Sequence, residues 1–174
     1  MYIIIDGYNL IRQSHFLRSY EKQSLEAGRR ALIKTLADYK KKKDHNITVV
    51  FDGWIGGSSK EERDRQENIS IIYSRYGEKA DDVIKRLADE SREETIIVSS
   101  DREIAAYVAR RGKTALSSTE FEALMGKASL ESPSRGFDAE KDAADESEHH
   151  SPKKGPARRL PRAYRHKQAK IKKL

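Results

Sequence analysis

Residues 3–6 read IIID, and two further apolar runs also end in an aspartate, ITVVFD at residues 47–52 and IIVSSD at residues 96–101. A fourth run, ISIIYS at residues 69–74, precedes a helix-like segment that opens with Asp81 and Asp82. Short apolar runs that alternate with helix-like segments are typical of βαβ units, in which the strands are parallel. The aspartates are therefore expected on one rim of the sheet, where open α/β proteins bind their ligands.

The same alternation predicts the fold class. We expect an α/β protein with a mostly parallel central sheet of about five strands, given by YIIID, ITVVFD, ISIIYS, TIIVSS and KTALS. Helical spacing of apolar residues predicts helices over residues 25–43, 80–90 and 119–127. The helix after the fourth strand should have Ser100 as its N-cap and Glu103 at N3, and should end at Gly112.

Composition divides the chain into three parts. Residues 1–127 form the predicted domain, residues 128–152 an acidic flexible linker, and residues 153–174 a basic tail without a fixed fold. The last 24 residues contain ten Lys and Arg and no Asp or Glu, which is typical of a segment that binds polyanions. The alternative to polyanion binding is that this segment is a solvated tail that only aids solubility.

Several classes of protein are excluded or disfavoured. The chain contains no cysteine, which excludes disulfides, cysteine nucleophiles and zinc sites built on cysteine. No P-loop or GxGxxG motif occurs, and the histidines lie in the tail or beside predicted helices. No basic leader and no run of ~18 apolar residues is present, so we expect a cytoplasmic protein that does not bind a membrane.

The gathered carboxylates indicate a cation site. Asp6, Asp81 and Asp101 are the candidate ligands of Mg²⁺ or Mn²⁺, which prefer oxygen donors and can activate a water for attack on a phosphodiester. Each aspartate also has a structural explanation, because Asp6 suits an Asx-turn and the others suit the first turn of a helix. Neighbouring helical residues diverge by about 100°, so only one of Asp81 and Asp82 is expected to face the crevice. Asp81 is preferred, because it lies less squarely opposite the apolar stripe of Val83, Ile84 and Leu87.

Further residues at this rim are candidates for more than one role. Asn9 is a candidate for orienting the substrate or the water, and Ser99 or Ser100 for supplying a hydroxyl. Asp52 is either a further acid around the cation or a turn residue. Trp54, in a glycine-rich loop, either stacks on an RNA base or anchors its loop.

Four motifs resemble those of the NYN domain, a PIN-like nuclease family, and specifically its bacterial YacP-like branch. They are IIIDGYN, VVFDG, ADD at residues 80–82 and SSDRE at residues 99–103. The resemblance covers about residues 1–125. It implies a PIN-like three-layer α/β/α fold, a Mg²⁺ or Mn²⁺ site, and endoribonuclease activity on single-stranded RNA linked to the ribosome. Asp6, Asn9, Asp81 and Asp101 match the acidic-site positions of the family.

The main hypothesis is thus a metal-dependent endoribonuclease whose partners are RNA and the ribosome, with a role in mRNA decay. The alternatives are a non-catalytic RNA-binding module and a metal-dependent phosphatase that acts on small phosphate esters. The expected RNA contacts, besides Trp54, are basic residues: Arg102, Lys153, Lys154, Arg158, Arg159, Arg162 and Arg165.

Overall fold

The computed structural model describes residues 1–53, 59–130, 162–171 and 173–174. The chain divides into two compact units, Met1–Leu130 and Glu131–Leu174, and each is described by itself.

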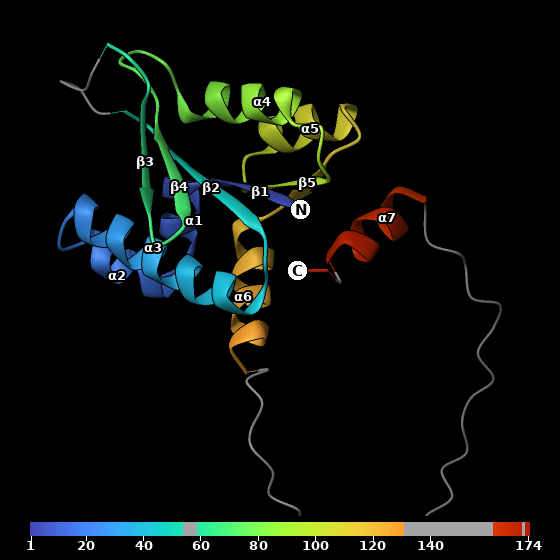
Figure 1. The fold of residues 1–174 in the computed structure, drawn as a ribbon, viewed down its shortest axis with the longest axis horizontal. Helices are drawn as coiled ribbons and strands as arrows, with labels where there is room; N and C mark the ends of the chain where they lie inside the picture. Colours follow the sequence, from blue (N-terminus) through green and yellow to red (C-terminus); the bar gives the residue numbers. More distant parts are fainter. Residues whose placement is uncertain (54–58, 131–161, 172) are drawn as a thin grey trace, which may run out of the picture. The chain divides into compact units, whose positions relative to one another are not determined.

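The first unit is built on a six-stranded sheet of order β3-β4-β2-β1-β5-β6, in which every neighbouring pair is parallel except β3 and β4 (Figure 1). The strands are β1 (Tyr2–Asp6), β2 (Asn46–Phe51), β3 (Glu62–Gln66), β4 (Ile69–Tyr73), β5 (Thr95–Val98) and β6 (Thr114–Leu116). The inner strands are buried along nearly their whole length, as parallel strands covered on both faces must be.

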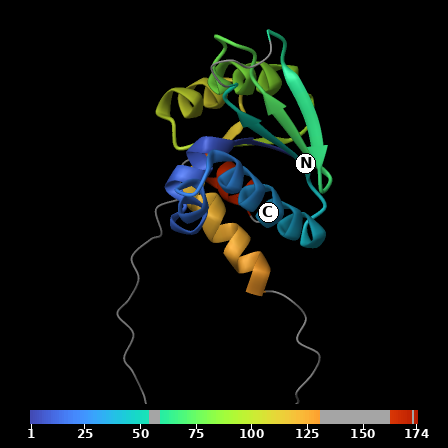
Figure 2. The same cartoon turned by 90° about the vertical axis from the view of Figure 1, so that its left-hand side faces the viewer.

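Helices cover both faces of this sheet (Figures 1 and 2). Helices α4 (Ala80–Glu90) and α5 (Arg102–Arg110) lie on one face. The opposite face carries α1 (Gly7–Gln13), α2 (His15–Glu21), α3 (Leu25–Lys42) and α6 (Ser118–Leu130). The predicted three-layer α/β/α arrangement is therefore confirmed.

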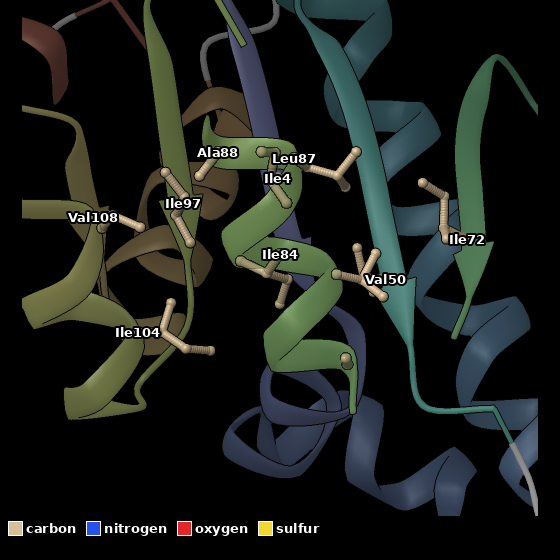
Figure 3. Close-up of a cluster of buried hydrophobic side chains, with 11 residues drawn as sticks. Ile4, Val50, Ile72, Ile84, Leu87, Ala88, Ile97, Ile104 and Val108 are labelled. Atoms are coloured by element: carbon tan, nitrogen blue, oxygen red, sulfur yellow. The ribbon is translucent and has the colours of Figure 1, made fainter. Parts of the chain in front are cut away.

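The packing of α4 and α5 follows from side-chain alternation along the strands. Ile4, Val50, Ile72 and Ile97, from four neighbouring strands, form one buried cluster with residues of α4 and α5 (Figure 3). The residues on either side of them in the strands point to the other face. The helical members are Ala80, Val83, Ile84, Leu87, Ala88, Ile104 and Val108. This cluster fixes the start of α4 close to the carboxyl end of the sheet.

β3 is not among the five strands that the sequence predicts. β3 pairs antiparallel with β4, and the two are joined by a tight turn in which Glu67 and Asn68 have φ values of 51° and 64°. Two successive residues with positive φ are characteristic of the hairpin turn that suits the natural twist of a sheet. All five residues of β3 are exposed and polar, so they show no apolar alternation that would predict a strand.

Helices α1 and α2 were also not predicted. Gly7, which follows the aspartate that suits an Asx-turn, is the first residue of α1. A Cβ at this position would lie 2.3 Å from the ring of Phe51, so Gly7 is required for the close approach of α1 to β2. Each helix has only seven residues, too few for the sequence to show a helical period.

In the second unit the described residues include one helix, α7 (Arg162–Ile171). This segment was expected to lack a fixed fold, but Ala, Gln, Lys and Arg are strong helix formers, and the segment consists largely of them. Among the residues that the structure describes, no helix combines the length and the apolar character needed to cross a membrane.

Candidate active site

The candidate site lies where the strand order changes direction. The chain passes from β1 through α1–α3 to β2 on one side, and it later returns through α4 to β5 on the other side of β1. Such a switch point creates a crevice outside the carboxyl ends of the strands. Asp6, Asp52 and Ser99 stand at or directly after the ends of the three neighbouring strands β1, β2 and β5.

Asp6 is the last residue of β1 and the N-cap of α1. Its Oδ1 accepts a hydrogen bond from the backbone N–H of Asn9 at 3.1 Å, and its Oδ2 accepts one from the hydroxyl of Ser99 at 3.1 Å. Only 9% of the residue is exposed. Burial raises the pKa of Asp6 to about 6 despite the two hydrogen bonds, and the charges of Asp81 and Asp52 act in the same direction. The carboxylate is thus held in place in a poorly solvated setting.

Ser99 connects Asp6 to Asp101. Its buried hydroxyl donates to Asp6 and accepts a hydrogen bond from the backbone N–H of Asp101 at 3.1 Å. Asp101 is the N-cap of α5, and its Oδ1 accepts from the N–H groups of Glu103 at 2.6 Å and Ile104 at 3.2 Å. The prediction of Ser100 as N-cap is therefore wrong by one residue, because the carboxylate of Asp101 makes both capping hydrogen bonds.

Asn9 holds three segments together. Its Oδ1 accepts from the backbone N–H of Ser100 at 2.9 Å and from the hydroxyl of Ser118 at 2.8 Å. The backbone N–H of Ser118 in turn donates to the hydroxyl oxygen of Ser100 at 3.1 Å. Asn9 therefore uses its carbonyl to position the β5–α5 turn. Ser118 was missed by the sequence analysis, although a serine at the start of a predicted helix is a recognisable signal.

Asp52 and Asp81 complete the acidic group from the side of α4. Lys79, the N-cap of α4, makes no side-chain capping bond; Asp52 instead accepts from the N–H of Ala80 at 2.6 Å. Burial raises the pKa of Asp81, and Asp101, Asp52 and Asp82 add to this effect. Lys85, one helical turn further along α4, lowers the same pKa. Its spacing of four residues from Asp81 was the signal that sequence analysis overlooked.

Asp81 and Asp82 differ in their surroundings. Asp81 is partly buried and coupled to Asp52 and Asp101, whereas Asp82 is exposed and lines a separate hollow with Tyr76. This difference agrees with the preference for Asp81, although the role of either residue stays a prediction.

The carboxylates do not converge on one point. In the described part of the chain, no group of three or more His, Cys, Asp or Glu residues is placed to hold a metal ion together. Mg²⁺, however, is commonly held by one or two carboxylates and keeps several waters. The oxygen donors of Asp6 and Asp81, whose pKa values are raised partly by neighbouring negative charge, fit a hard cation bound in that manner.

The predicted RNA contacts are only partly visible. Arg102 is exposed at the first residue of α5, beside Asp101. Arg162 and Arg165 belong to α7. The remaining predicted contacts lie outside the described residues: Trp54, Lys153, Lys154, Arg158 and Arg159.

Comparison with known proteins identifies the family. The model of the YacP-like NYN domain matches residues 3–172, well beyond the region in which the motifs were recognised. A curated relative, the uncharacterized protein YacP of Bacillus subtilis, is 29% identical over 86 residues, which is 49% of this chain and 50% of that protein. The aligned region thus spans only half of the relative.

Solved structures agree on the fold. Two crystal structures of Rae1 (YacP) from Bacillus subtilis, one of them a point mutant, match with TM-scores of 0.63 and 0.64 at 22% identity. The matches cover 74% to 75% of this chain and 76% to 77% of the others. The similarity supports the PIN-like fold predicted from the motifs. With the family model matching almost the whole length, the chain belongs to the YacP-like NYN domain family, a family of the nuclease type.

Proposed function

We propose that the protein is a metal-dependent endoribonuclease that cleaves single-stranded RNA. The observation that supports this most strongly is the electrostatic coupling of aspartates from separate parts of the chain. Asp6 is the last residue of β1, and Asp52 directly follows β2. Asp81 belongs to α4, and Asp101 is the N-cap of α5. A fold gains no stability from negative charges that help to raise the pKa values of Asp6 and Asp81, so this arrangement favours a ligand with positive charge.

The residues that would hold Mg²⁺ or Mn²⁺ are Asp6 and Asp81, with Asp101 contacting the cation directly or through water. Such an ion lowers the pKa of a bound water and offsets negative charge on a phosphodiester. Ser99 keeps the Asp6 carboxylate in one orientation, and Asn9 fixes the turn that carries Ser99 and Asp101. Asp52, by capping α4, holds the helix turn from which Asp81 projects.

Charge on the opposite helical layer favours a nucleic acid as substrate. Residues 15–43, which form α2 and α3 with their C-cap, contain nine Lys and Arg against three Asp and Glu. The ten cations of residues 151–174 add to this excess. Basic surfaces bind phosphate backbones by releasing counterions. Ribosomal RNA offers such a backbone, and on this ground we include the ribosome among the partners.

The test is a cleavage assay on single-stranded RNA, alone and with ribosomes, in Mg²⁺, in Mn²⁺ and in EDTA. We expect endonucleolytic products that disappear in EDTA. Asp6→Asn should abolish cleavage, because the amide keeps the shape of the side chain and removes its charge. Asp44→Asn, an exposed change between α3 and β2, is the matched control and should cleave at the wild-type rate.

Two other results would replace the proposal. Binding of RNA without cleavage, in every cation and with ribosomes present, would identify a non-catalytic RNA-binding module. Turnover of a generic phosphate ester, with RNA left intact, would identify a phosphatase.

A further inference from the structure

A hollow separate from the carboxylate group opens beside the start of α4. It has a volume of about 570 Å³ and is lined by Ser59, Arg75, Tyr76, Gly77, Glu78 and Asp82. Volumes of this size are usual for sites that bind small ligands. Asp82 directly follows Asp81, so the first turn of α4 carries both a residue of the hollow and a residue of the candidate active site.

The hollow presents an exposed aromatic ring. Tyr76 is 65% exposed, more than any other large hydrophobic residue in the described part of the chain. Single exposed rings are common on protein surfaces, but the place of Tyr76 in the lining of the hollow makes its ring available to stack on a bound ligand. Phe16, on α2, is the next most exposed at 56%.

The turn that carries Tyr76 is held rigidly. Ser74 is buried, its hydroxyl donates to the carbonyl of Glu78 at 2.7 Å, and the same oxygen accepts from the N–H of Gly53 at 2.8 Å. The N–H of Glu78 donates to the carbonyl of Arg75 at 3.0 Å, and the two side chains form an ion pair at 3.4 Å. Tyr76 is therefore displayed on a fixed support, which lowers the entropy lost when a ligand stacks on it.

We propose that this hollow binds one unpaired base of the RNA next to the cleaved bond, with Tyr76 stacking on its face and Asp82 accepting hydrogen bonds from its edge. The inference deepens the proposed function and takes from it the identity of the ligand as RNA. Bases that are splayed from a single strand are commonly bound by aromatic stacking together with hydrogen bonds to their edges.

The carboxylate of Asp82 determines which base is favoured. A carboxylate accepts hydrogen bonds only, so it suits a base edge that presents N–H donors. The edge of guanine presents two neighbouring donors, and adenine and cytosine each present one amino group. On the corresponding edge of uracil the single N–H stands between two carbonyl oxygens, which the carboxylate repels. The hollow therefore favours guanine and disfavours uracil.

The experiment measures binding of the full-length protein to labelled oligouridylates with and without one central guanine. EDTA prevents cleavage, and moderate salt reduces the non-specific contribution of the basic residues. Wild type should bind the guanine-containing strand more tightly. Tyr76→Ala should weaken that binding about tenfold, the usual scale for losing one stacked base. Tyr76→Phe keeps the ring and should bind as wild type.

Two further variants separate the two contacts. Asp82→Asn should lose the preference for guanine and keep the affinity for the strand of uridines alone. Phe16→Ala removes a similarly exposed ring from the basic layer of α2 and α3, so it should affect both strands alike and keep the preference for guanine. Thermal unfolding of each variant confirms that the fold is intact.

The proposal is overturned if Tyr76→Ala binds the guanine-containing strand as tightly as wild type, or if Asp82→Asn retains the preference for guanine. Neither result depends on catalysis. A protein that shows the expected binding pattern but never cuts RNA would refute the proposed nuclease activity and support the proposed base-binding site. RNA cleavage with the same KM in wild type and Tyr76→Ala would refute the base-binding site and leave the proposed nuclease activity standing.

Discussion

Asp6 combines a structural role with the chemical role that we propose for it, and the two differ in their need for charge. As the N-cap of α1 it needs only an acceptor oxygen, which an asparagine also supplies. As a cation ligand it needs a negative charge in a buried position. The sequence predicted the location of this carboxylate correctly because IIID ends a buried strand. It did not reveal the hydrogen bond from Ser99, which joins residues 93 positions apart.

The raised pKa of Asp6 predicts how the stability of the metal-free protein depends on pH. The folded pKa of about 6 lies above the ordinary value of 3.8, so the folded state holds more protons between these values. The free energy of unfolding should then fall as pH rises from about 4 to about 6, by about 3 kcal/mol. Asp6→Asn should lack this contribution and should exceed wild type in stability at pH 7.5.

Urea unfolding in EDTA at several pH values between 4 and 7.5 measures this difference. Asp38→Asn, whose side chain is exposed, serves as the control and should follow the wild-type profile. Parallel pH profiles for wild type and Asp6→Asn would contradict the predicted coupling.

The neighbouring pair Asp81 and Asp82 allows a second prediction. Asp81→Asn should lower kcat on RNA by about 10²-fold or more, the scale on which a single charge-stabilising group acts. Asp82→Asn should lower kcat much less, because Asp82 is exposed and lines the neighbouring hollow. Rates at saturating RNA measure the effect. A larger reduction for Asp82 would show that the cation is bound on the other side of α4.

Among the elements, those with a clear apolar period were predicted well and those without one were not. α4 and α3 were predicted almost to the residue, because their buried residues recur at helical spacing. α1 is short, and β3 consists of exposed polar residues, so their formation depends on contacts with the rest of the fold. The candidate site shows the same division. Asp6 and Asp52 stand at strand ends that the sequence predicts, whereas the capping of α4 by Asp52 joins residues 28 positions apart.

The junction of β2, β4 and α4 depends on Gly53. A Cβ at this position would lie 1.8 Å from the backbone carbonyl oxygen of Ser74, which is too close for any real structure. Gly53→Ala should therefore destabilise the protein by at least about 1–3 kcal/mol, the usual cost of overpacking. It should also lower RNA cleavage, because the same junction supports Tyr76 and Asp81.

Gly126→Ala is the matched control for this change. Gly126 lies inside α6, and an added Cβ would meet nothing within 4 Å. This substitution should stabilise the protein by about 0.5–1 kcal/mol, because alanine favours the helix over glycine. Thermal unfolding compares both variants with wild type, and equal shifts in the same direction would refute the packing argument.

For the whole molecule, the uneven charge predicts how binding depends on salt. A chain that ends at Leu130 retains the first compact unit, including Ala128, whose carbonyl accepts a hydrogen bond from Lys42. This truncation should weaken binding to RNA or ribosomes. It should also flatten the dependence of binding on salt, by about 0.7 in slope for each phosphate of a single strand that the shortened protein no longer neutralises. Titrations at several salt concentrations measure the slope. An unchanged slope would show that residues 131–174 do not contact the phosphates.

The open edge of the sheet also bears on self-association. An edge strand offers unpaired backbone groups to which a strand of another molecule can add, and this is a common route to aggregation. Here the edge is β3, whose sequence ERDRQ contains two arginines, a glutamate and an aspartate in five exposed residues. A second copy that added a strand along this edge would have to desolvate several of these charges at once. The same polarity that left β3 without an apolar pattern in the sequence therefore also disfavours pairing along this one of the two edges of the sheet.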